Sequence, residues 1–498
     1  DLTEAAAEGK LDPVIGRDDE KRALNKLVES KKAQFLAVWG RRRVGKTYLI
    51  EQSFQTKDTL YFCITGLRKG SLKKQLTLFT NKYKETFFAD LALQLKEPTS
   101  WLAAFELLTN TINKQAGQKK IVLFFDELPW LAQKRSGFLN ALDHYWNTAW
   151  SKNNKMIVVV CGSAASWMIK HVINDKGGLH NRVTAQLPLH PFSLKETQAY
   201  LASISAQFNQ QQIVELYMAI GGIPHYLEKI DPALSVSQNI SKLCLSRGGE
   251  LINEFDKLFN SLFDNASAYI ELINVIAQKQ SGLTRTELTS KIKLTASGGT
   301  LSERLQALEE AGFIRSFIPV GKLEKGIYYR VIDEYCLFYL TWIKPVKRQI
   351  EHEVNPSYWQ SKHQSPAWRS WSDYAFESVC LKHVAQIRKA LFIPDGSLSN
   401  SWKVQPNEKG VTDGAQIDLL FDRDDGVVTI CEIKYNQQPF QINKQYAKNL
   451  QHKMDAFKQA TKLNKQIYLS MVTLAPLKKN LYSEELVRSK ATVEDLFE

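Results

Sequence analysis

The sequence predicts an α/β multidomain protein with a parallel sheet in its N-terminal part and a second α/β domain at its C-terminal end. Three observations support this class. Apolar runs near the N-terminus end in a glycine-rich loop, residues 40–47, or in the carboxylates Asp126 and Glu127. The middle of the chain has helical periodicity, and two apolar runs flank an acidic turn at residues 423–426. Continuous apolar runs followed by polar loops are typical of parallel strands that are buried on both faces.

Length and composition are those of a soluble protein with several domains. The 498 residues suffice for about three or four domains of ordinary size. A hydrophobic fraction of 44% and a charged fraction of 23% are ordinary for globular proteins. The longest apolar stretch, residues 156–168, is interrupted by Gly162 and serines and is too short to cross a bilayer. We therefore expect no membrane association. Because the N-terminus is acidic, reads as helical and lacks the pattern of a secretory leader, we expect a cytoplasmic protein.

The net charge of the chain bears on its binding partners, and its cysteines bear on the redox state of its compartment. A net charge of +13 favours a polyanionic partner such as DNA, although a basic surface can also serve only to keep a protein in solution. Six cysteines are scattered along the chain without the paired spacing of a metal site. We interpret them as reduced, partly buried thiols.

The residues at 40–47, Gly-Arg-Arg-Arg-Val-Gly-Lys-Thr, have the spacing of a loop that cradles nucleotide phosphates. Glycines let successive N–H groups point at one anion, and the helix that follows adds its positive N-terminal end. Lys46 can reach the β- and γ-phosphates, and Thr47 can hold Mg²⁺. The apolar run at 35–39 predicts the preceding strand. We expect ATP and Mg²⁺ at this loop, bound by Gly40, Arg41, Arg42, Arg43, Val44, Gly45, Lys46, Thr47 and Tyr48.

A second apolar run, residues 121–125, ends in Asp126 and Glu127. A buried parallel strand delivers such carboxylates at the C-terminal edge of the sheet, so we expect Asp126 to bind Mg²⁺ and Glu127 to polarise the attacking water. The alternative is a solvated acidic turn. A third run ends before Ser163, which either senses the γ-phosphate or the water, or caps the next helix.

Arg182 follows a glycine-rich segment. It is a candidate arginine finger that acts on its own nucleotide or on that of a neighbouring subunit in a homo-oligomer. The alternative is a surface arginine in a loop.

The order of strand, phosphate loop, acidic strand and Gly-Ser strand, followed by Gly221-Gly222-Ile-Pro224, resembles the archaeal-type ATPases of the AAA+/STAND group. The resemblance covers most of the chain. It implies a P-loop ATPase domain of the AAA+/ASCE type over residues 1–195 and a helical lid over residues 196–262. In that family a proline of the lid contacts the bound nucleotide, and Pro224 matches this proline.

The segment at residues 9–20 is similar to the one that precedes the first ATPase domain of Clp-type unfoldases. There, a Val-Ile-Gly-Arg element lines the adenine pocket, which implies the same role for Val14 and Ile15. The resemblance stops at the phosphate loop. Residues 47–120 contain no aromatic-glycine pore loop, and the chain has no second phosphate loop. Unfoldase activity is therefore disfavoured.

Residues 263–345 predict a winged helix, because three helical segments precede two strands that can form a hairpin. The predicted segments are helices at 269–277, 283–292 and 300–312, strands at 313–317 and 327–331, and a turn at 321–326. Winged helices often read DNA through the third helix. Here that helix carries Glu303, Glu309 and Glu310 against Arg304, and acidic side chains repel phosphates. A regulatory or packing role, against the ATPase or a protein partner, is the alternative.

The C-terminal part covers residues 346–498. The polar stretch at 344–366 is interpreted as a linker, and an aromatic helix that contains Glu377 follows it. Further on, Asp418 and Glu432 lie on two predicted strands of a hairpin. Lys434 shares a strand face with Glu432 because side chains alternate along a strand. Two neighbouring carboxylates can hold Mg²⁺, and the metal together with Lys434 can polarise a phosphodiester.

This pattern resembles the PD-(D/E)xK nucleases, whose restriction-endonuclease-like domain occupies the C-terminus in the same ATPase family. The resemblance implies Glu377, Asp418 and Glu432 as metal ligands and Glu432 and Lys434 as catalytic residues. Asp418 follows an isoleucine rather than the proline of the motif. The basic segment at 443–458 predicts either a helix that follows a phosphate backbone or a solvated amphipathic helix.

The sequence thus predicts a protein that binds and hydrolyses ATP and couples its nucleotide state to a metal-dependent DNA nuclease domain. The alternatives are a nucleotide-driven switch or scaffold, whose C-terminal domain binds DNA or protein without cutting, and an acidic hairpin of purely structural role.

Overall fold

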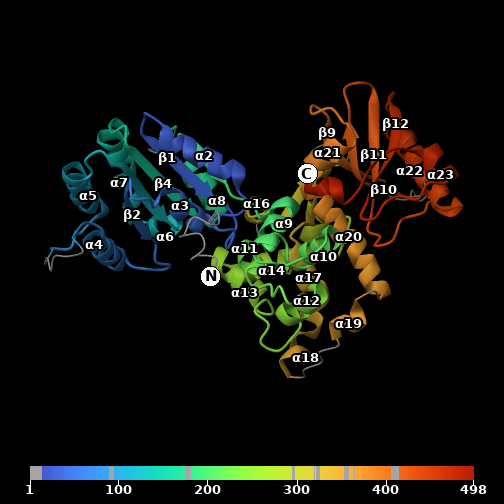
Figure 1. The fold of residues 1–498 in the computed structure, drawn as a ribbon, viewed down its shortest axis with the longest axis horizontal. Helices are drawn as coiled ribbons and strands as arrows, with labels where there is room; N and C mark the ends of the chain where they lie inside the picture. Colours follow the sequence, from blue (N-terminus) through green and yellow to red (C-terminus); the bar gives the residue numbers. More distant parts are fainter. Residues whose placement is uncertain are drawn as a thin grey trace. The chain divides into compact units, whose positions relative to one another are not determined.

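The computed structural model describes residues 14–88, 95–174, 179, 181–293, 298–318, 320, 326–352, 358–363, 365–404 and 414–498. The N-terminal segment that we expected to be helical, residues 1–13, lies outside this range, as does most of the turn expected at 321–326. The chain divides into two compact units, Asp1–Pro191 and Phe192–Glu498 (Figure 1). None of the described helices combines the length and the apolar character needed to cross a membrane.

Five parallel strands form the sheet of the first unit in the order β2-β3-β4-β1-β5. The strands are β1 (Gln34–Trp39), β2 (Thr59–Thr65), β3 (Lys120–Asp126), β4 (Met156–Gly162) and β5 (Ala185–Pro188). The expected buried apolar strands are therefore present. Because the strands are parallel, the C-terminal ends of β1, β3 and β4 meet at one edge. This edge carries the glycine-rich loop, Asp126 and Ser163.

Helices surround this sheet (Figure 1). They are α2 (Asp18–Glu29), α3 (Lys46–Phe54), α4 (Leu72–Phe88), α5 (Trp101–Gln115), α6 (Leu128–Leu131), α7 (Phe138–Thr148) and α8 (Ala165–Met168), with short turns at Trp150–Lys152 and Ile169–Ile173. Phe105 of α5 packs against Phe125 of β3 and Phe138 of α7, with ring centroids 5.4 Å apart in each case. Aromatic packing thus fixes α5 and α7 on the sheet behind the edge that carries Asp126.

The second unit begins with five helices, consistent with the helices expected after residue 195. They are α9 (Leu194–Ser203), α10 (Gln210–Ile220), α11 (Pro224–Leu227), α12 (Val236–Cys244) and α13 (Glu254–Leu262). Capping boxes begin α9, α10 and α12, which explains why these helices start where they do. Residues 213–220 of α10 are all buried, so this helix lies at the centre of the bundle.

Three helices and a small antiparallel sheet follow, in the order expected for residues 263–345. They are α14 (Ala266–Ile276), β6 (Leu283–Thr284), α15 (Arg285–Lys291), α16 (Gly298–Glu310), β7 (Ile314–Phe317) and β8 (Tyr328–Val331), and the sheet order is β6-β8-β7. The second helix starts at Arg285 rather than Leu283, because Thr284 caps it and residues 283–284 pair with β8.

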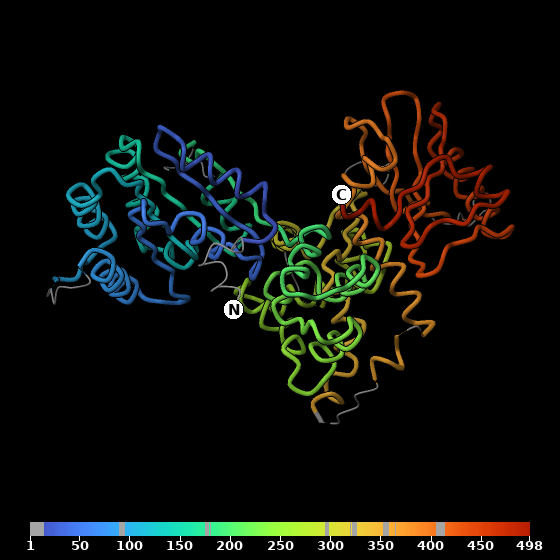
Figure 2. Tube along the Cα trace, viewed as in Figure 1, coloured from blue at the N-terminus to red at the C-terminus, as the bar shows by residue number. Residues whose placement is uncertain are grey.

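The interpretation of residues 344–366 as a linker is wrong where the structure describes them. After α17 (Glu334–Phe338) and the turns Tyr339–Ile343 and Lys344–Val346, the chain forms α18 (Lys347–His352) and α19 (Tyr358–Lys362), drawn in orange (Figure 2). Trp359 is fully buried and packs edge-on against Trp342 and Trp368, with centroids 5.7 and 5.2 Å away. Trp359 and the buried Ile350 thus tie this polar stretch to the core.

A mixed five-stranded sheet in the order β13-β12-β11-β10-β9 forms the C-terminal part. Its elements are α20 (Pro366–Lys382), α21 (Val384–Ala390), β9 (Leu398–Val404), β10 (Ala415–Asp422), β11 (Val427–Lys434), α22 (Lys444–Thr461), β12 (Gln466–Thr473), α23 (Leu481–Leu486), β13 (Val487–Ala491) and the turn Glu494–Phe497. The predicted hairpin is confirmed, because β10 and β11 pair antiparallel. The predicted basic helix is also present as α22, which packs Phe457 against Trp402 of β9.

Candidate active sites

The glycine-rich loop of the first unit is shaped for close approach of an anion. A side chain at Gly40 would meet the backbone oxygen of Leu189 at 2.1 Å, so this position requires glycine. Gly45 immediately precedes α3 with φ 86°, and Arg43 has φ 71°, both in the left-handed region. Such turns aim backbone N–H groups into one concavity at the N-terminus of a helix. The loop is therefore suited to hold phosphate groups.

Lys46 lies buried within this loop. Its Nζ donates hydrogen bonds to the backbone oxygens of Gly40 (3.0 Å) and Arg41 (2.9 Å) and to Oγ of Ser163 (3.0 Å). The structure thus brings together the predicted phosphate-binding lysine and the predicted sensor residue, although they are 117 positions apart in sequence.

Thr47 and Asp126 meet at the sheet edge, where Thr47 Oγ1 donates to Asp126 Oδ2 at 3.0 Å. Burial raises the pKa of Asp126, and the neighbouring Glu127 raises it further. A cation beside Asp126 would offset both effects, since it favours the charged carboxylate. Hydroxyl and carboxylate oxygens are the ligand types that Mg²⁺ prefers. The pair therefore fits the metal predicted for it.

Glu127 is held by Ser163. The Oε1 atom of Glu127 accepts a hydrogen bond from Ser163 Oγ at 2.6 Å, and Oε2 accepts one from the Ser163 N–H at 3.3 Å. Glu127 has φ 47°, a conformation uncommon for a residue with a side chain. One hydroxyl group thus connects the ammonium group of Lys46 to the carboxylate of Glu127.

The N-terminal segment is attached to the phosphate loop through a residue that sequence reasoning missed. Arg17 is buried, and its Nη2 donates to the backbone oxygens of Val44 (3.2 Å) and His190 (2.6 Å). Arg17 therefore fixes the segment that contains Val14 and Ile15 beside the loop. Val14 is buried and Ile15 is partly buried. Arg17 is the arginine of the Val-Ile-Gly-Arg element, so this element could have indicated its importance from sequence.

Other predicted nucleotide residues have more open settings. Arg182 is exposed and lies in a turn, where its backbone N–H donates to the backbone oxygen of Leu179. Tyr48 of α3 is 46% exposed. Pro224 lies in the second unit as the first residue of α11. Nucleotide contact by Arg182, Tyr48 and Pro224 stays a prediction.

The comparisons with known proteins agree with this geometry. Residues 15–230 match the family model described as an ATPase domain predominantly from Archaea. The chain contains an archaeal-type ATPase domain. An uncharacterized protein of Methanocaldococcus jannaschii, MJECL04, is 25% identical over 383 residues, which cover 76% of this chain and 79% of that protein. The similarity therefore extends well beyond the ATPase domain.

Part of the chain is also similar to a Clp chaperone. The chaperone ClpB of Pseudomonas putida is 34% identical over 130 residues, which cover 26% of this chain and only 13% of ClpB.

Among solved structures, the Walker-type ATPase PABY2304 of Pyrococcus abyssi superposes with a TM-score of 0.45 at 19% identity. The superposition covers 66% of this chain and 96% of the PABY2304 chain. The ORC2 protein of Aeropyrum pernix gives a TM-score of 0.41 at 13% identity, covering 71% and 96%.

Far along the chain from the ATPase domain's phosphate loop, β10 and β11 bring two of the predicted carboxylates together. Leu419 pairs with Cys431, so Asp418, which precedes Leu419, and Glu432, which follows Cys431, are cross-strand neighbours. Glu432 is buried. Its Oε1 accepts a hydrogen bond from Tyr446 Oη at 2.6 Å, and its Oε2 lies 2.6 Å from Lys453 Nζ. Burial raises the pKa of Asp418, and the nearby carboxylates raise it further.

Glu377 of α20 forms an ion pair with Arg330 of β8. Nη1 of Arg330 donates to Glu377 Oε1, and Nη2 donates to Ser378 Oγ at 3.3 Å. The guanidinium carbon lies 5.0 Å from the centre of the Tyr374 ring. Both charged groups are buried. Arg330 of β8 thus neutralises Glu377, the third predicted carboxylate. The sequence did not indicate this partner.

Lys434 contacts a carboxylate that was not predicted. Its Nζ lies 3.0 Å from Asp373 Oδ2, and the N–H of Tyr435 donates to Asp373 Oδ1 at 3.1 Å. Among the described residues, no three His, Cys, Asp or Glu side chains are arranged to hold a metal ion. Asp418 and Glu432 offer the right donor atoms for Mg²⁺, whereas Glu377 is engaged by Arg330. Metal binding by the three carboxylates stays a prediction.

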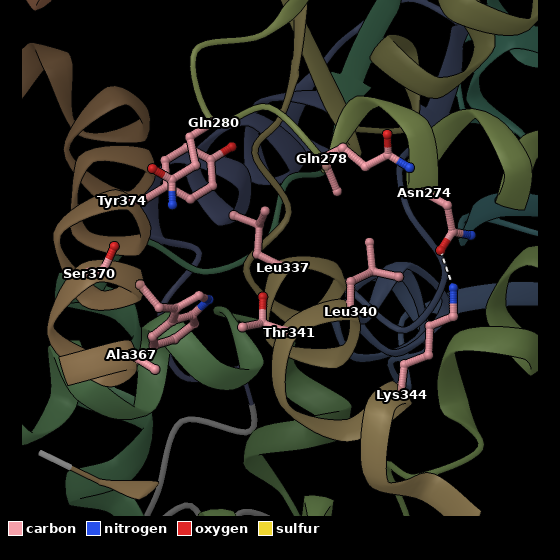
Figure 3. A pocket seen from close by; sticks show the side chains of 12 residues that line it. Asn274, Gln278, Gln280, Leu337, Leu340, Thr341, Lys344, Ala367, Ser370 and Tyr374 are labelled. Carbon is pink, nitrogen blue, oxygen red and sulfur yellow. Dashed lines mark hydrogen bonds between the residues drawn. The ribbon is translucent and has the colours of Figure 1, made fainter. Parts of the chain in front are cut away.

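A separate cavity of 620 Å³ lies among α14, α20 and the turn that contains Thr341 (Figure 3). Lys344 Nζ donates to Asn274 Oδ1 at this cavity. Tyr374, which lies beneath Arg330, also lines it. The described lining residues include no Asp or Glu, so the carboxylate chemistry is placed elsewhere.

Proposed function

We propose that this protein binds and hydrolyses ATP and couples its nucleotide state to a metal-dependent DNA nuclease activity of the C-terminal part. The hydrogen-bonded set of Lys46, Thr47, Asp126, Glu127 and Ser163 carries the first half of the proposal. The facing carboxylates Asp418 and Glu432 support the second half. Coupling is motivated by the presence of both sites in one chain.

Each residue of the ATPase set has a role that follows from its chemistry. Backbone N–H groups of the loop and the Lys46 ammonium group bind the β- and γ-phosphates. Thr47 and Asp126 would hold Mg²⁺, which supplies neutralisation of the phosphate charge when bound. Glu127 accepts a hydrogen bond from the attacking water and orients it toward the γ-phosphorus. Before this step Glu127 must exchange its bond to Ser163 for one to water.

The C-terminal residues provide carboxylates and cations for a phosphodiester. Asp418 and Glu432 would hold the metal ion, which supplies Lewis-acid activation when bound. The helix α22 carries several lysines, of which Lys453 contacts Glu432, and the net charge of +13 favours a DNA partner. In hydrolysis the oxygen of water bonds to phosphorus and one P–O ester bond breaks. One proton of the water goes to the leaving alcohol, and the other is lost from the phosphate product.

A second candidate function is a nucleotide-driven switch whose C-terminal part binds DNA or protein without cutting it. This candidate is favoured by the partners of the carboxylates. Glu377 forms an ion pair with Arg330, and Glu432 is hydrogen-bonded to Tyr446 and Lys453. In this arrangement the carboxylates act as partners for internal cations rather than as free metal ligands.

A cleavage assay separates the two candidates. Wild type, Glu432→Ala and Lys46→Ala are incubated with single- and double-stranded DNA in Mg²⁺ or Mn²⁺, with and without ATP. We expect cleavage by wild type, loss of cleavage in Glu432→Ala, and an effect of ATP that is absent in Lys46→Ala. Cleavage that is indifferent to ATP and to Lys46→Ala contradicts the coupling. Absence of cleavage under every condition supports the switch.

A further inference from the structure

The lysine of the nuclease-like motif is already paired with a residue of α20. The carboxylate of Asp373 accepts hydrogen bonds from Lys434 Nζ at 3.0 Å and from the backbone N–H of Tyr435 at 3.1 Å. Two consecutive residues of the chain thus fix this carboxylate. The ammonium group of Lys434 is thus directed to a carboxylate of α20 rather than to Asp418 or Glu432.

A different lysine reaches the facing carboxylates. Lys453 lies on α22, and its Nζ is 2.6 Å from Glu432 Oε2. Tyr446 lies seven residues earlier on the same helix and donates to the other oxygen of Glu432 at 2.6 Å. A separation of seven residues is about two helical turns, so both side chains project from one face of α22. Packing of α22 on the sheet sets this face, through contacts such as Phe457 with Trp402.

The charges of the group agree with this placement. Lys453 forms an ion pair with the buried Glu432, and Asp418 is the cross-strand neighbour of that glutamate. With Arg330 on Glu377, Lys453 is the second internal cation of the group.

We propose that Lys453 of α22, rather than Lys434 of the motif, is the catalytic lysine that contacts the phosphate of the DNA substrate. The inference rests on the proposed nuclease function. When a phosphodiester lies against Asp418 and Glu432, the Lys453 ammonium group turns from Glu432 Oε2 to a non-bridging phosphate oxygen. There it stabilises the negative charge that grows on the phosphoryl group as water attacks. Lys434 stays with Asp373 and supports the end of β11.

Two matched substitutions in the full chain test the assignment, Lys453→Met and Lys434→Met. The first readout is the initial rate of duplex cleavage in Mn²⁺. The second is the affinity for a fluorescent duplex in EDTA over a series of salt concentrations, which requires neither metal nor cleavage. Removing one electrostatic contact to a transition state lowers a rate by about 100-fold or more. Removing one phosphate contact lowers the slope of log K against log salt by about one.

We expect Lys453→Met to show both effects, and Lys434→Met to change the rate by less than about threefold and leave the slope unchanged. Both effects in Lys434→Met, or an unchanged slope in Lys453→Met, overturn the assignment. If wild type cuts no DNA, the nuclease proposal and the catalytic role of Lys453 both fail, and the slope then decides only whether Lys453 contacts a DNA phosphate. If Lys453→Met does not fold by circular dichroism, Lys453→Arg replaces it. That variant should retain the slope and lose about tenfold in rate, because a guanidinium group does not substitute for a compact ammonium group. An unchanged rate in Lys453→Arg overturns the assignment.

Discussion

Ser163 connects Lys46 and Glu127, the two charged side chains to which we assign phosphate binding and water activation. Its hydroxyl oxygen accepts from Lys46 Nζ at 3.0 Å, and its hydroxyl hydrogen is donated to Glu127 at 2.6 Å. We predict that Ser163→Ala lowers the ATP turnover rate about tenfold, since a misplaced general base loses part of its typical contribution. The affinity for ATP should change less than about twofold, because Lys46 retains two backbone partners. Steady-state turnover and equilibrium binding of a nucleotide analogue measure the two quantities.

Ser163→Thr is the matched control, because threonine keeps the hydroxyl group. It should retain most of the turnover. Equal losses in Ser163→Ala and Ser163→Thr would point to packing at the end of β4 rather than to the hydrogen bonds. A rise in turnover in Ser163→Ala would show that Ser163 restrains Glu127 instead of positioning it.

At the same scale, the residues of the ATPase motifs could be predicted from sequence, whereas the partners of the C-terminal carboxylates could not. The phosphate loop has a fixed spacing because its backbone must follow one path, so Lys46 and Thr47 were identifiable. The pairing of Glu377 with Arg330 joins residues 47 positions apart through burial in the folded chain. No local pattern encodes that contact. The same holds for Lys453, which in sequence is one lysine among several on a basic helix.

The helix α15 shows how a local motif fixes an element. Thr284 caps the helix, and Glu287 reaches back to accept from the Thr284 N–H at 2.7 Å and hydroxyl group at 2.9 Å. Lys279 donates to the same carboxylate at 2.6 Å. Burial raises the pKa of Glu287, but the hydrogen bonds from Lys279 and Thr284 outweigh it and lower the pKa to about 2. The charged carboxylate is therefore the form that stabilises the helix.

This lowered pKa gives the stability of α15 a definite pH dependence. A carboxyl group whose pKa is lower in the folded than in the unfolded chain contributes stability above its unfolded pKa of 4.5. That stability is lost as the pH falls from 4.5 toward 2. We predict that Glu287→Gln speeds hydrogen exchange in α15 about two- to fivefold at pH 7, the size of a weakened cap. The ratio to wild type should fall toward one as the pH falls from 4.5 toward 2.

Hydrogen exchange resolved by mass spectrometry measures the ratio at each pH, so the pH dependence of the intrinsic exchange rate cancels. Segments of α5, in the other unit, serve as the internal control. A ratio that stays constant between pH 7 and pH 3 would contradict the role of the charged carboxylate.

Elements built from apolar periodicity were predictable, whereas one element that depends on tertiary burial was not. The strands β1, β3 and β4 were visible as apolar runs because a parallel sheet buries both faces. The hairpin of β10 and β11 was visible from its acidic turn. Residues 344–366 were interpreted as a linker because most of them are polar. Trp359 nevertheless packs into a tryptophan cluster, and a single buried aromatic side chain is too sparse a signal to predict a helix.

At the scale of the whole molecule, the ATPase domain matched by residues 15–230 extends past the boundary between the two compact units. The phosphate loop and Asp126 lie in the first unit, and Pro224 lies in the second. Coupling as proposed requires that bound nucleotide changes the free energy of both units. A ligand that contacts residues of only one unit stabilises only that unit directly.

We therefore predict two thermal unfolding transitions, both of which rise when Mg²⁺ and a non-hydrolysable ATP analogue are added. Ligand at 100 times its Kd stabilises the structure that binds it by about 2.7 kcal/mol, which corresponds to a rise of several degrees in Tm. Lys46→Ala should abolish both shifts, because the loop loses its phosphate contact. Pro224→Ala should keep the shift of the first unit and lose that of the second, if Pro224 contacts the nucleotide as the family resemblance implies. Differential scanning calorimetry at fixed protein concentration resolves the two transitions. A shift confined to the first unit in wild type would contradict the nucleotide-responsive lid, and ATP would then have no thermodynamic route to the carboxylates of β10 and β11.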